Sequence, residues 1–205
     1  MITAKHQFFL YHFFRLYGLW GVKRHFDHVE ISGTYTDKTG PILIIANHVS
    51  WWDGFWVVYF REKIVKKRFY FMMLEEELKK NIFLKYAGGY SINKKSRTII
   101  ETIRYTQKLL QDNENMILMF PQGRIESLYQ DFIHFEKGIH SILEKAPDCR
   151  IFFIANFIDF CTSRKPTLFL NFQEIEHTPS NIMNLEKLYN LFYLEKQNIQ
   201  KQKIF

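Results

Sequence analysis

The sequence contains little cysteine, only Cys149 and Cys161 among 205 residues. No CxxC pair or other zinc-type spacing occurs, so we expect a reducing compartment and no structural metal. No uncharged apolar run reaches the roughly 18–20 residues that span a bilayer. The beginning of the chain has no signal-peptide pattern, because Lys5 and His6 precede an aromatic stretch without a small-residue cleavage site. These absences favour a cytoplasmic protein without a membrane-spanning helix.

Apolar, aromatic and basic residues are abundant instead. The hydrophobic fraction of 47% suits one domain, residues 1–205, with a substantial core. Aromatic residues make up 18% of the chain, and we expect part of this ring surface to lie outside the core, at an interface between water and an apolar phase. With 28 Lys+Arg against 21 Asp+Glu, the net charge of +7 favours polyanionic partners: nucleic acid, an anionic membrane or a phosphorylated carrier.

Short apolar runs alternate along the chain with segments of helical spacing. The apolar runs predict strands near residues 28–35, 41–46, 68–74, 90–92, 115–120, 150–157 and 167–172. The helical spacing predicts helices near residues 5–26, 54–60, 75–86, 97–111, 136–145 and 180–200. This alternation, without repeats or linkers, predicts an α/β domain whose central sheet is mostly parallel and flanked by helices.

The predicted N-terminal helix, within residues 1–26, is amphipathic with an unusually wide aromatic face. Its polar stripe is narrow and consists of Lys5, His12 and Lys23. The helix either packs against the domain as ordinary core, or lies in a membrane interface with its rings among the lipids and Lys23 and Arg24 at the headgroups. The aromatic density and the basic flank favour the membrane, on the inner, cytoplasmic face.

A histidine and an aspartate follow the strand predicted at residues 41–46. His48 lies at the end of the strand, where α/β proteins place their sites, and Asp53 follows five residues later. Residues five apart on one helix lie about 140° apart around its axis, so the two side chains can meet only if the segment between them folds back as a turn. The carboxylate would then accept one ring N–H and leave the other nitrogen as a base. Alternatively, Ser50 or Asp53 merely caps a helix.

Two further loops follow strands and converge on the same crevice in an open α/β sheet. One, Ile92-Asn93-Lys94-Lys95, supplies two cations. The other, Phe120-Pro121-Gln122-Gly123-Arg124, supplies a glycine that lets backbone approach a ligand and a guanidinium suited to phosphate or carboxylate. Taken singly, the first loop is better explained as a solvated loop and the second as an ordinary turn.

Taken in order, these segments resemble the signatures of the glycerolipid acyltransferase family, which includes lysophosphatidate and glycerol-3-phosphate acyltransferases. The family patterns N-H-x-x-x-x-D, G-x-x-x-I-[DN]-[RK], F-P-x-G and F-x-K-G occur here as Asn47–Asp53, Gly88–Lys94, Phe120–Gly123 and Phe135–Gly138. The resemblance covers residues 40–158, more than half of the chain, and identifies this stretch as a motif-bearing catalytic core.

The resemblance implies an O-acyltransferase with a glycerol-3-phosphate acyltransferase-like fold. Its donor would be a fatty acyl thioester of coenzyme A or acyl carrier protein, and its acceptor a hydroxyl of a lysolipid or related lipid. His48 would act as the general base and Asp53 would hold the imidazole. The implied substrate-binding residues are Asn93, Lys94, Lys95, Phe120, Pro121, Gln122, Gly123 and Arg124. Neither a metal nor an organic cofactor is implied.

Several positions depart from the family pattern F-P-E-G-T-R-S. Gln122 replaces the glutamate, Arg124 the threonine and Ile125 the arginine, and Lys94 stands where arginine is common. A guanidinium holds phosphate in a defined orientation better than an ammonium does. The changes favour an acceptor without a glycerol phosphate, such as an aminolipid or glycolipid. The alternative is a relaxed phosphate site built from Lys94, Lys95 and Arg124.

Two rival functions have different consequences. A non-catalytic membrane or lipid-binding protein of the same fold is favoured if His48 and Asp53 point apart. A nucleic-acid binder would use the positive charge and the rings, but the sequence has no helix-turn-helix, RRM signature or basic helix, so we expect no nucleic-acid partner.

Overall fold

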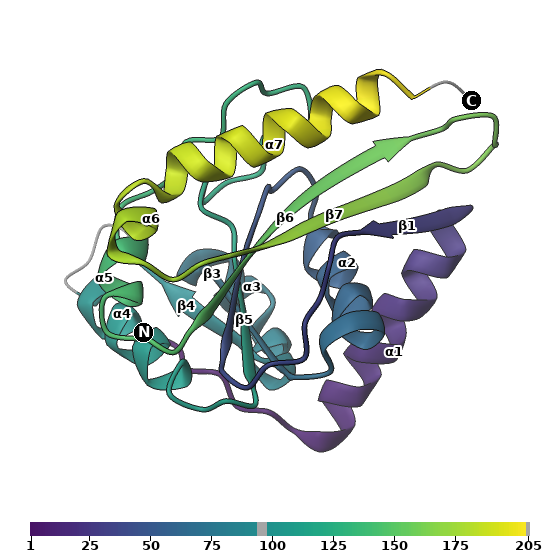
Figure 1. Ribbon diagram of the computed structural model, residues 1–205. Helices are drawn as coiled ribbons and strands as arrows, with labels where there is room; N and C mark the ends of the chain where they lie inside the picture. The colour runs from purple at the N-terminus through teal and green to yellow at the C-terminus, as the bar shows by residue number, and fades with distance from the viewer. Residues whose placement is uncertain (94–97, 204–205) are drawn as a thin grey trace.

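The computed structural model describes residues 1–93 and 98–203 and shows one twisted sheet between layers of helices (Figure 1). The sheet has seven strands in the order β1-β7-β6-β2-β5-β3-β4. The strands are β1 His28–Ser32, β2 Ile42–Ala46, β3 Arg68–Leu74, β4 Gly89–Ile92, β5 Asn115–Met119, β6 Arg150–Asp159 and β7 Thr167–Ile175. The β6 and β7 strands pair antiparallel, whereas the other neighbouring strands pair parallel. The predicted α/β class with a mostly parallel sheet is confirmed.

Helices connect the parallel strands and cover both faces of the sheet (Figure 1). The α-helices are α1 Phe8–His25, α2 Asp53–Phe60, α3 Glu75–Lys80, α4 Ile99–Leu109, α5 Ile139–Leu143, α6 Pro179–Met183 and α7 Leu185–Lys201. Two shorter segments complete the set, a π-helical turn η1 at Arg61–Val65 and a 3-10 turn η2 at Ile82–Ala87.

Several predicted boundaries were wrong. The helix expected over residues 75–86 ends at Lys80, because the Asn81 backbone leaves the helical region and the chain continues as η2. The helix expected over residues 136–145 starts only after Gly138, whose φ of 119° is outside the range of a right-handed helix. The helix expected over residues 180–200 is two helices, α6 and α7, joined at Asn184.

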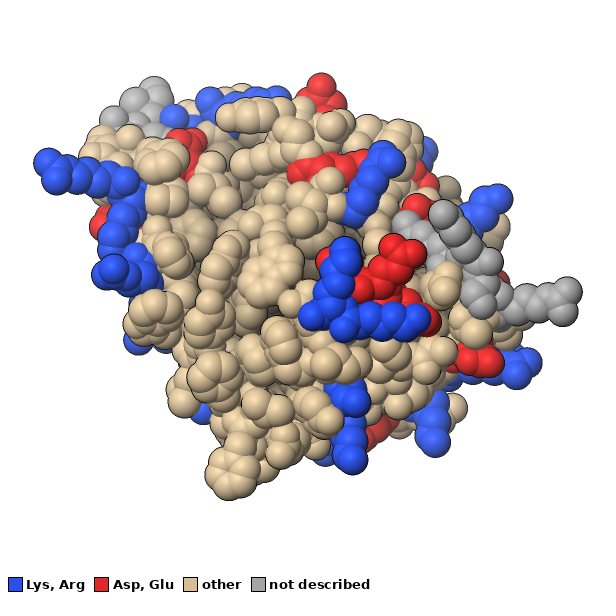
Figure 2. Space-filling view, turned by 180° about the vertical axis from the view of Figure 1, so that it is seen from behind, with Lys and Arg blue, Asp and Glu red and all other residues tan. Residues whose placement is uncertain are grey.

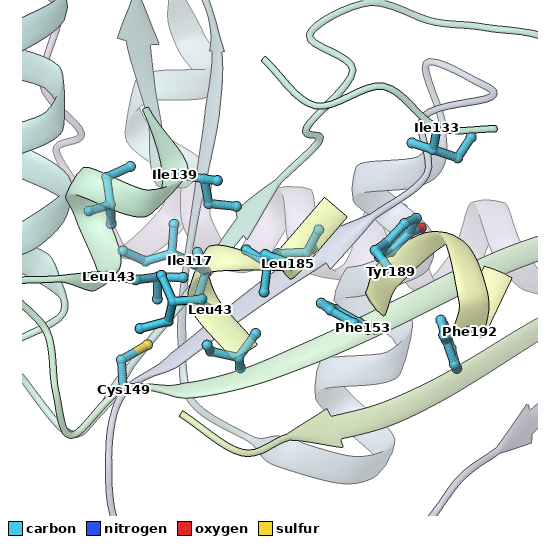
Figure 3. Packing of buried hydrophobic residues seen from close by; sticks show 14 of the residues in the cluster. Leu43, Ile117, Ile133, Ile139, Leu143, Cys149, Phe153, Leu185, Tyr189 and Phe192 are labelled. Carbon is cyan, nitrogen blue, oxygen red and sulfur yellow. The ribbon is translucent and has the colours of Figure 1, made fainter. Parts of the chain in front are cut away.

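Alternate residues of the central strand β2 divide the core between the two faces of the sheet. Leu43 and Ile45 face a cluster that includes α5, α6 and α7, and Figure 3 shows Tyr189 and Phe192 of α7 close to Phe153 of β6. The apolar positions of α7 recur with helical spacing, so its rings all reach the strand beneath. This face is a conventional hydrophobic core.

The opposite face of the sheet is covered by α2 and α1. Ile42 and Ile44 of β2 pack in this second cluster, together with Trp56 and Phe60 of α2. The α1 helix packs in turn on α2 with its smallest residues, since a Cβ atom on Gly18 would lie only 2.7 Å from the ring of Phe55. The close approach of α1 and α2 therefore depends on glycine at the contact.

Large apolar side chains of α1 remain exposed. Its buried residues are Gly18, Gly21 and Val22, whereas the exposed ones include Phe8, Phe9, Phe13, Leu16 and Trp20. Phe9 is 78% exposed and Trp20 57% exposed. A monomeric soluble surface rarely carries such a continuous set of rings, which marks α1 as an interaction surface.

Candidate functional site

The site begins where β2 ends, at a double hydrogen bond to the neighbouring strand β6. The Asn47 side-chain amide donates to the Asn156 carbonyl over 3.0 Å, and the Asn156 N–H donates to Asn47 Oδ1 over 2.8 Å. Asn47 is fully buried. The Asn47 amide thus holds β2 to β6 one residue beyond the regular strand and fixes the starting point of the His48 loop.

The His48 loop folds back so that histidine and aspartate meet. The His48 Nδ1 and Asp53 Oδ2 atoms lie 2.9 Å apart. The same Asp53 oxygen accepts the backbone N–H groups of Val49 over 2.7 Å and Ser50 over 2.9 Å. Because an ionised carboxylate can only accept, Nδ1 donates, and His48 Nε2 retains its lone pair. The turn predicted from the five-residue spacing is therefore present.

Asp53 is a carboxylate in an unfavourable environment that is partly compensated. Its side chain is fully buried at the first position of α2. Burial is the largest influence and raises the pKa of Asp53 above its usual value, while the hydrogen bonds from His48 and from the Ser50 and Val49 backbone oppose the rise. Its second oxygen, Oδ1, has no hydrogen-bond partner among the described residues. Asp53 Oδ2 therefore accepts all three hydrogen bonds that fix the imidazole and the turn.

The loop after β5 contacts both the imidazole ring and the backbone of His48. The Phe120 ring stacks on the His48 imidazole with centroids 4.0 Å apart and planes 8° apart. The Gln122 Oε1 atom accepts the His48 N–H over 2.6 Å, and the Glu126 N–H donates to the His48 carbonyl over 2.8 Å. Contacts on both the ring and the peptide groups leave His48 little freedom to move.

A cavity of about 410 Å³ extends from His48 between α1, α2, β3 and the loop after β5. The volume lies within the roughly 300–1,000 Å³ usual for small-molecule sites. Most of its lining is apolar, including Phe71, Met72, Leu84 and Ile103. Seen from behind, the molecule shows a broad uncharged surface with a hollow near its middle and charged side chains around its margins (Figure 2). A mostly apolar cavity that begins at an imidazole base suits a substrate with a long aliphatic chain.

The predicted substrate-binding residues are distributed unequally around this cavity. Phe120, Pro121, Gly123 and Arg124 line it, together with His48. Gln122 is buried behind the loop and is not among the described lining residues. Asn93 directly follows β4 and is half-buried, and it too is absent from the described lining residues. Lys94 and Lys95, and the predicted start of the helix at 97, lie outside the described residues.

Arg124 and Ile125 occupy the position where the sequence departs from the family pattern. The Arg124 Nε atom donates to Glu126 Oε1 over 2.7 Å, and the side chain is 75% exposed. Ile125 is half exposed at the cavity wall. The guanidinium is therefore already engaged with a carboxylate, and an apolar side chain stands beside it.

Sequence reasoning assigned no role to Asn47, Glu126 or Asn156. Asn47 belongs to the N-H-x-x-x-x-D motif, but the partner of its amide, Asn156 on β6, lies more than a hundred residues later in the chain. Glu126 comes four residues after Gln122, and its involvement depends on how the intervening loop folds. For Glu126, the sequence showed only a carboxylate four residues after a glutamine.

The described residues contain no group of three or more His, Cys, Asp and Glu side chains placed to hold a metal ion. None of the described helices combines the length and the apolar character that crossing a membrane requires.

Comparisons with known proteins identify a family and a similar fold. Residues 28–155 match the family model described as Acyltransferase, and these residues include both His48 and Asp53. Among solved structures, the 1-acyl-sn-glycerophosphate acyltransferase PlsC of Thermotoga maritima superimposes with a TM-score of 0.69 at 16% identity, covering 95% of this chain and 81% of that one. At that identity the likeness concerns the fold. No curated protein sequence matches the chain.

Proposed function

Because the chain belongs to the acyltransferase family, we propose that it transfers a fatty acyl group from a thioester to a lipid hydroxyl, with His48 as the base. The donor is a fatty acyl thioester of coenzyme A or acyl carrier protein, and the acceptor is a lysolipid or related lipid. The observation that carries the proposal is the 2.9 Å contact between His48 Nδ1 and buried Asp53 at the head of an apolar cavity.

The reaction follows from the unshared lone pair of His48. The Nε2 atom removes the proton of the acceptor hydroxyl as its oxygen attacks the thioester carbonyl. A carbon–oxygen bond forms, the carbon–sulfur bond breaks, and the proton passes from the imidazolium to the departing thiolate. Asp53 stabilises the imidazolium while it exists, and the Phe120 ring keeps the imidazole plane in place. The acyl group moves in one step between substrates, so no acyl-enzyme is needed.

The rival interpretation, a lipid-binding protein without catalysis, would be favoured by His48 and Asp53 pointing apart. They are hydrogen-bonded, and the carboxylate is buried where its ionised form is costly. A binding protein gains nothing from maintaining such a pair, whereas a base needs it. Catalysis therefore explains the arrangement better.

The acceptor is proposed to lack a glycerol phosphate. A phosphate site needs fixed cations, yet Arg124 is engaged with Glu126 and Ile125 presents an apolar surface beside it. Releasing Arg124 to bind a phosphate would leave the Glu126 carboxylate with one hydrogen bond fewer. A hydroxylipid without a phosphate, such as an aminolipid or glycolipid, fits this wall of the cavity better than lysophosphatidate does.

The protein is proposed to bind the inner face of the membrane through α1. Tyr11, Phe14 and Arg15 of this helix line the cavity, while Phe13 and Trp20 point outward and are exposed. Its last turn carries Lys23 and Arg24, which suit anionic headgroups. The lipid-binding helix and the wall of the cavity are therefore the same element, so a lipid acceptor has a short path from bilayer to His48.

Acyl transfer is tested with liposomes that contain the acceptor lipid and with a labelled acyl thioester in solution. Replacing His48 by alanine should lower kcat at least about 10²-fold, the usual contribution of a general base. His28→Ala is the matched control, because His28 is exposed at the start of β1 and should leave kcat unchanged. Parental activity in a folded His48→Ala protein would refute the mechanism.

The acceptor class is tested by competition between lysophosphatidate and a hydroxylipid without phosphate, with the same donor. We expect the hydroxylipid to be preferred. Strong preference for lysophosphatidate, lost in Arg124→Ala, would show instead that Arg124 leaves Glu126 to bind phosphate.

A further inference from the structure

We propose that Glu126 is a positioning residue, which fixes the orientation of the Gln122 side-chain amide and through it the backbone of His48. The inference rests on the proposed acyl transfer at His48. It assigns a role to a carboxylate that contacts neither the imidazole nor Asp53.

The segment from Gln122 to Glu126 holds both polar groups of the His48 peptide backbone. The His48 N–H donates to Gln122 Oε1 over 2.6 Å, and the His48 carbonyl accepts the Glu126 N–H over 2.8 Å. The stacked Phe120 ring belongs to the same loop. Any displacement of this segment therefore moves the imidazole relative to Asp53 and the cavity.

The weak point of this arrangement is the symmetry of a glutamine amide. Its oxygen and nitrogen ends have nearly the same shape, but only the oxygen can accept the His48 N–H. The reversed amide would place two donors against each other in a site where Gln122 is only 4% exposed, so water could not relieve the conflict. Something must favour one orientation over the other.

Glu126 supplies that preference. Its Oε2 atom accepts the Gln122 Nε2–H over 2.7 Å, and its Oε1 atom accepts Arg124 Nε–H over 2.7 Å. The hydrogen bond from Gln122, and after it that from Arg124, holds the pKa of Glu126 below its usual value, so the group remains ionised near neutral pH. An ionised carboxylate accepts and cannot donate, and it therefore requires the NH₂ end of Gln122 to face it.

The same contacts explain why glutamine replaces glutamate in the F-P-x-G segment of this chain. A carboxylate at position 122 would face the Glu126 carboxylate at the distance where the amide now donates, and like charges at such a separation repel. With the negative charge already at Glu126, the residue at 122 must offer one acceptor and one donor.

A double-mutant cycle tests the coupling in the full chain. Gln122→Glu should lower kcat by about tenfold or more, because two carboxylates meet, and Glu126→Gln alone should lower it about threefold, because the charge that orients the amide is lost. The swapped variant Gln122→Glu with Glu126→Gln restores one acceptor for His48 and one donor–acceptor pair. Its kcat should return to within about threefold of the parent. Glu195→Gln is the matched control for loss of a charge, because Glu195 lies on the exposed face of α7.

Three readouts separate positioning from a general loss of structure. KM for the acyl thioester should change little, since the effect is on His48. The kcat of Gln122→Glu relative to the parent should rise as pH falls, because one of the facing carboxylates takes up a proton. The NMR signal of the His48 Nδ1 proton, protected by buried Asp53, should be lost in Gln122→Glu and return in the swapped variant.

Additive effects of the two substitutions, or a swapped variant that neither folds nor shows the protected proton, would overturn the inference. The NMR signal is measured without substrate. A cycle that behaves as expected by NMR in a protein without acyl transfer would therefore refute the proposed function and leave the coupling intact.

Discussion

The two long helices at the ends of the chain, α1 and α7, are both rich in aromatic residues but use them in opposite ways. The α7 helix buries Tyr189, Phe192 and Tyr193 against β6. The α1 helix fully buries two glycines and one valine and leaves rings such as Phe9 and Trp20 exposed. The aromatic side chains that α7 buries stabilise the fold, whereas the exposed rings of α1 contribute surface that the fold itself does not need.

The difference extends to the two faces of the sheet. The α7 side is mostly apolar core, while the α1 side also contains the buried Asp53 carboxylate, and the cavity that begins at His48 is lined by residues from both sides. Residues that serve catalysis often lower the free energy of unfolding, because a buried charge or an open cavity replaces packed apolar atoms. We therefore expect substitutions on the two sides to have separable effects on activity, stability and lipid binding.

The largest expected effect is on activity, from Asp53→Asn on the α1 side. The amide cannot stabilise imidazolium, so kcat should fall about 10³-fold or more. Stability should respond differently, because burial holds the folded-state pKa of Asp53 above its unfolded value of about 3.9. The parent is then most stable relative to Asp53→Asn at acid pH, and loses that advantage as pH rises through the raised pKa.

Thermal unfolding between about pH 4 and pH 8 measures this difference. We expect Asp53→Asn to unfold at a temperature equal to or above that of the parent at neutral pH, with the gap closing in acid. A large loss of stability at neutral pH would mean that the carboxylate is structural, and the proposed division between the two sides would fail.

The second effect is on stability, from Tyr189→Ala on the α7 side. Tyr189 is fully buried and packs edge-on against Phe153 with centroids 5.1 Å apart. Its removal should cost about 3–5 kcal/mol of unfolding free energy, the range for large aromatic residues in cores. Tyr189→Phe loses the 2.9 Å hydrogen bond to the Ile154 carbonyl but keeps the ring, and should cost about 1 kcal/mol. Denaturant titration measures both, and liposome binding by folded protein should not change.

The third effect is on lipid binding, from replacing Phe13 and Trp20 of α1 by serine. Each ring contributes roughly 1.5–3 kcal/mol when it enters an apolar phase. Cosedimentation with anionic liposomes should therefore weaken at least about tenfold, while the unfolding temperature stays near that of the parent. Leu191→Ser is the matched control, because Leu191 is similarly exposed but lies on α7. Equal losses from the two helices would show that exposed rings on α1 have no special role.

The smallest effect is electrostatic, from Lys23→Gln in the last turn of α1. A basic residue near an anionic membrane contributes about 1 kcal/mol, so binding should weaken about fivefold. The loss should vanish on uncharged liposomes and shrink at high salt. A loss of equal size on uncharged liposomes would indicate a packing defect.

The sequence was most informative where local patterns govern structure. The apolar run before His48 predicted a buried strand, and the five-residue spacing allowed His48 and Asp53 to meet only through the turn that is found. Element boundaries were less accessible, because the end of α3 at Lys80 and the start of α5 at Ile139 depend on backbone conformations at Asn81 and Gly138 that no periodicity indicates.

Contacts between distant segments could not be predicted. The Asn47 amide finds its partner on β6, and Gln122 faces His48 only because β2 and β5 are neighbours in the sheet. Judged from the sequence alone, the replacement of glutamate by Gln122 removes a negative charge. Glu126 retains that charge four residues later, and Gln122 itself is turned toward the backbone.

Phe14 belongs both to α1 and to the wall of the cavity, and this has a kinetic consequence. If α1 lies in the bilayer as proposed, the acceptor would reach His48 by lateral diffusion within the leaflet, and the product would return the same way. The concentration that governs turnover is then the mole fraction of acceptor in the surface. Diluting the acceptor with inert lipid at constant bulk amount should slow the reaction, whereas adding more liposomes of the same composition should not.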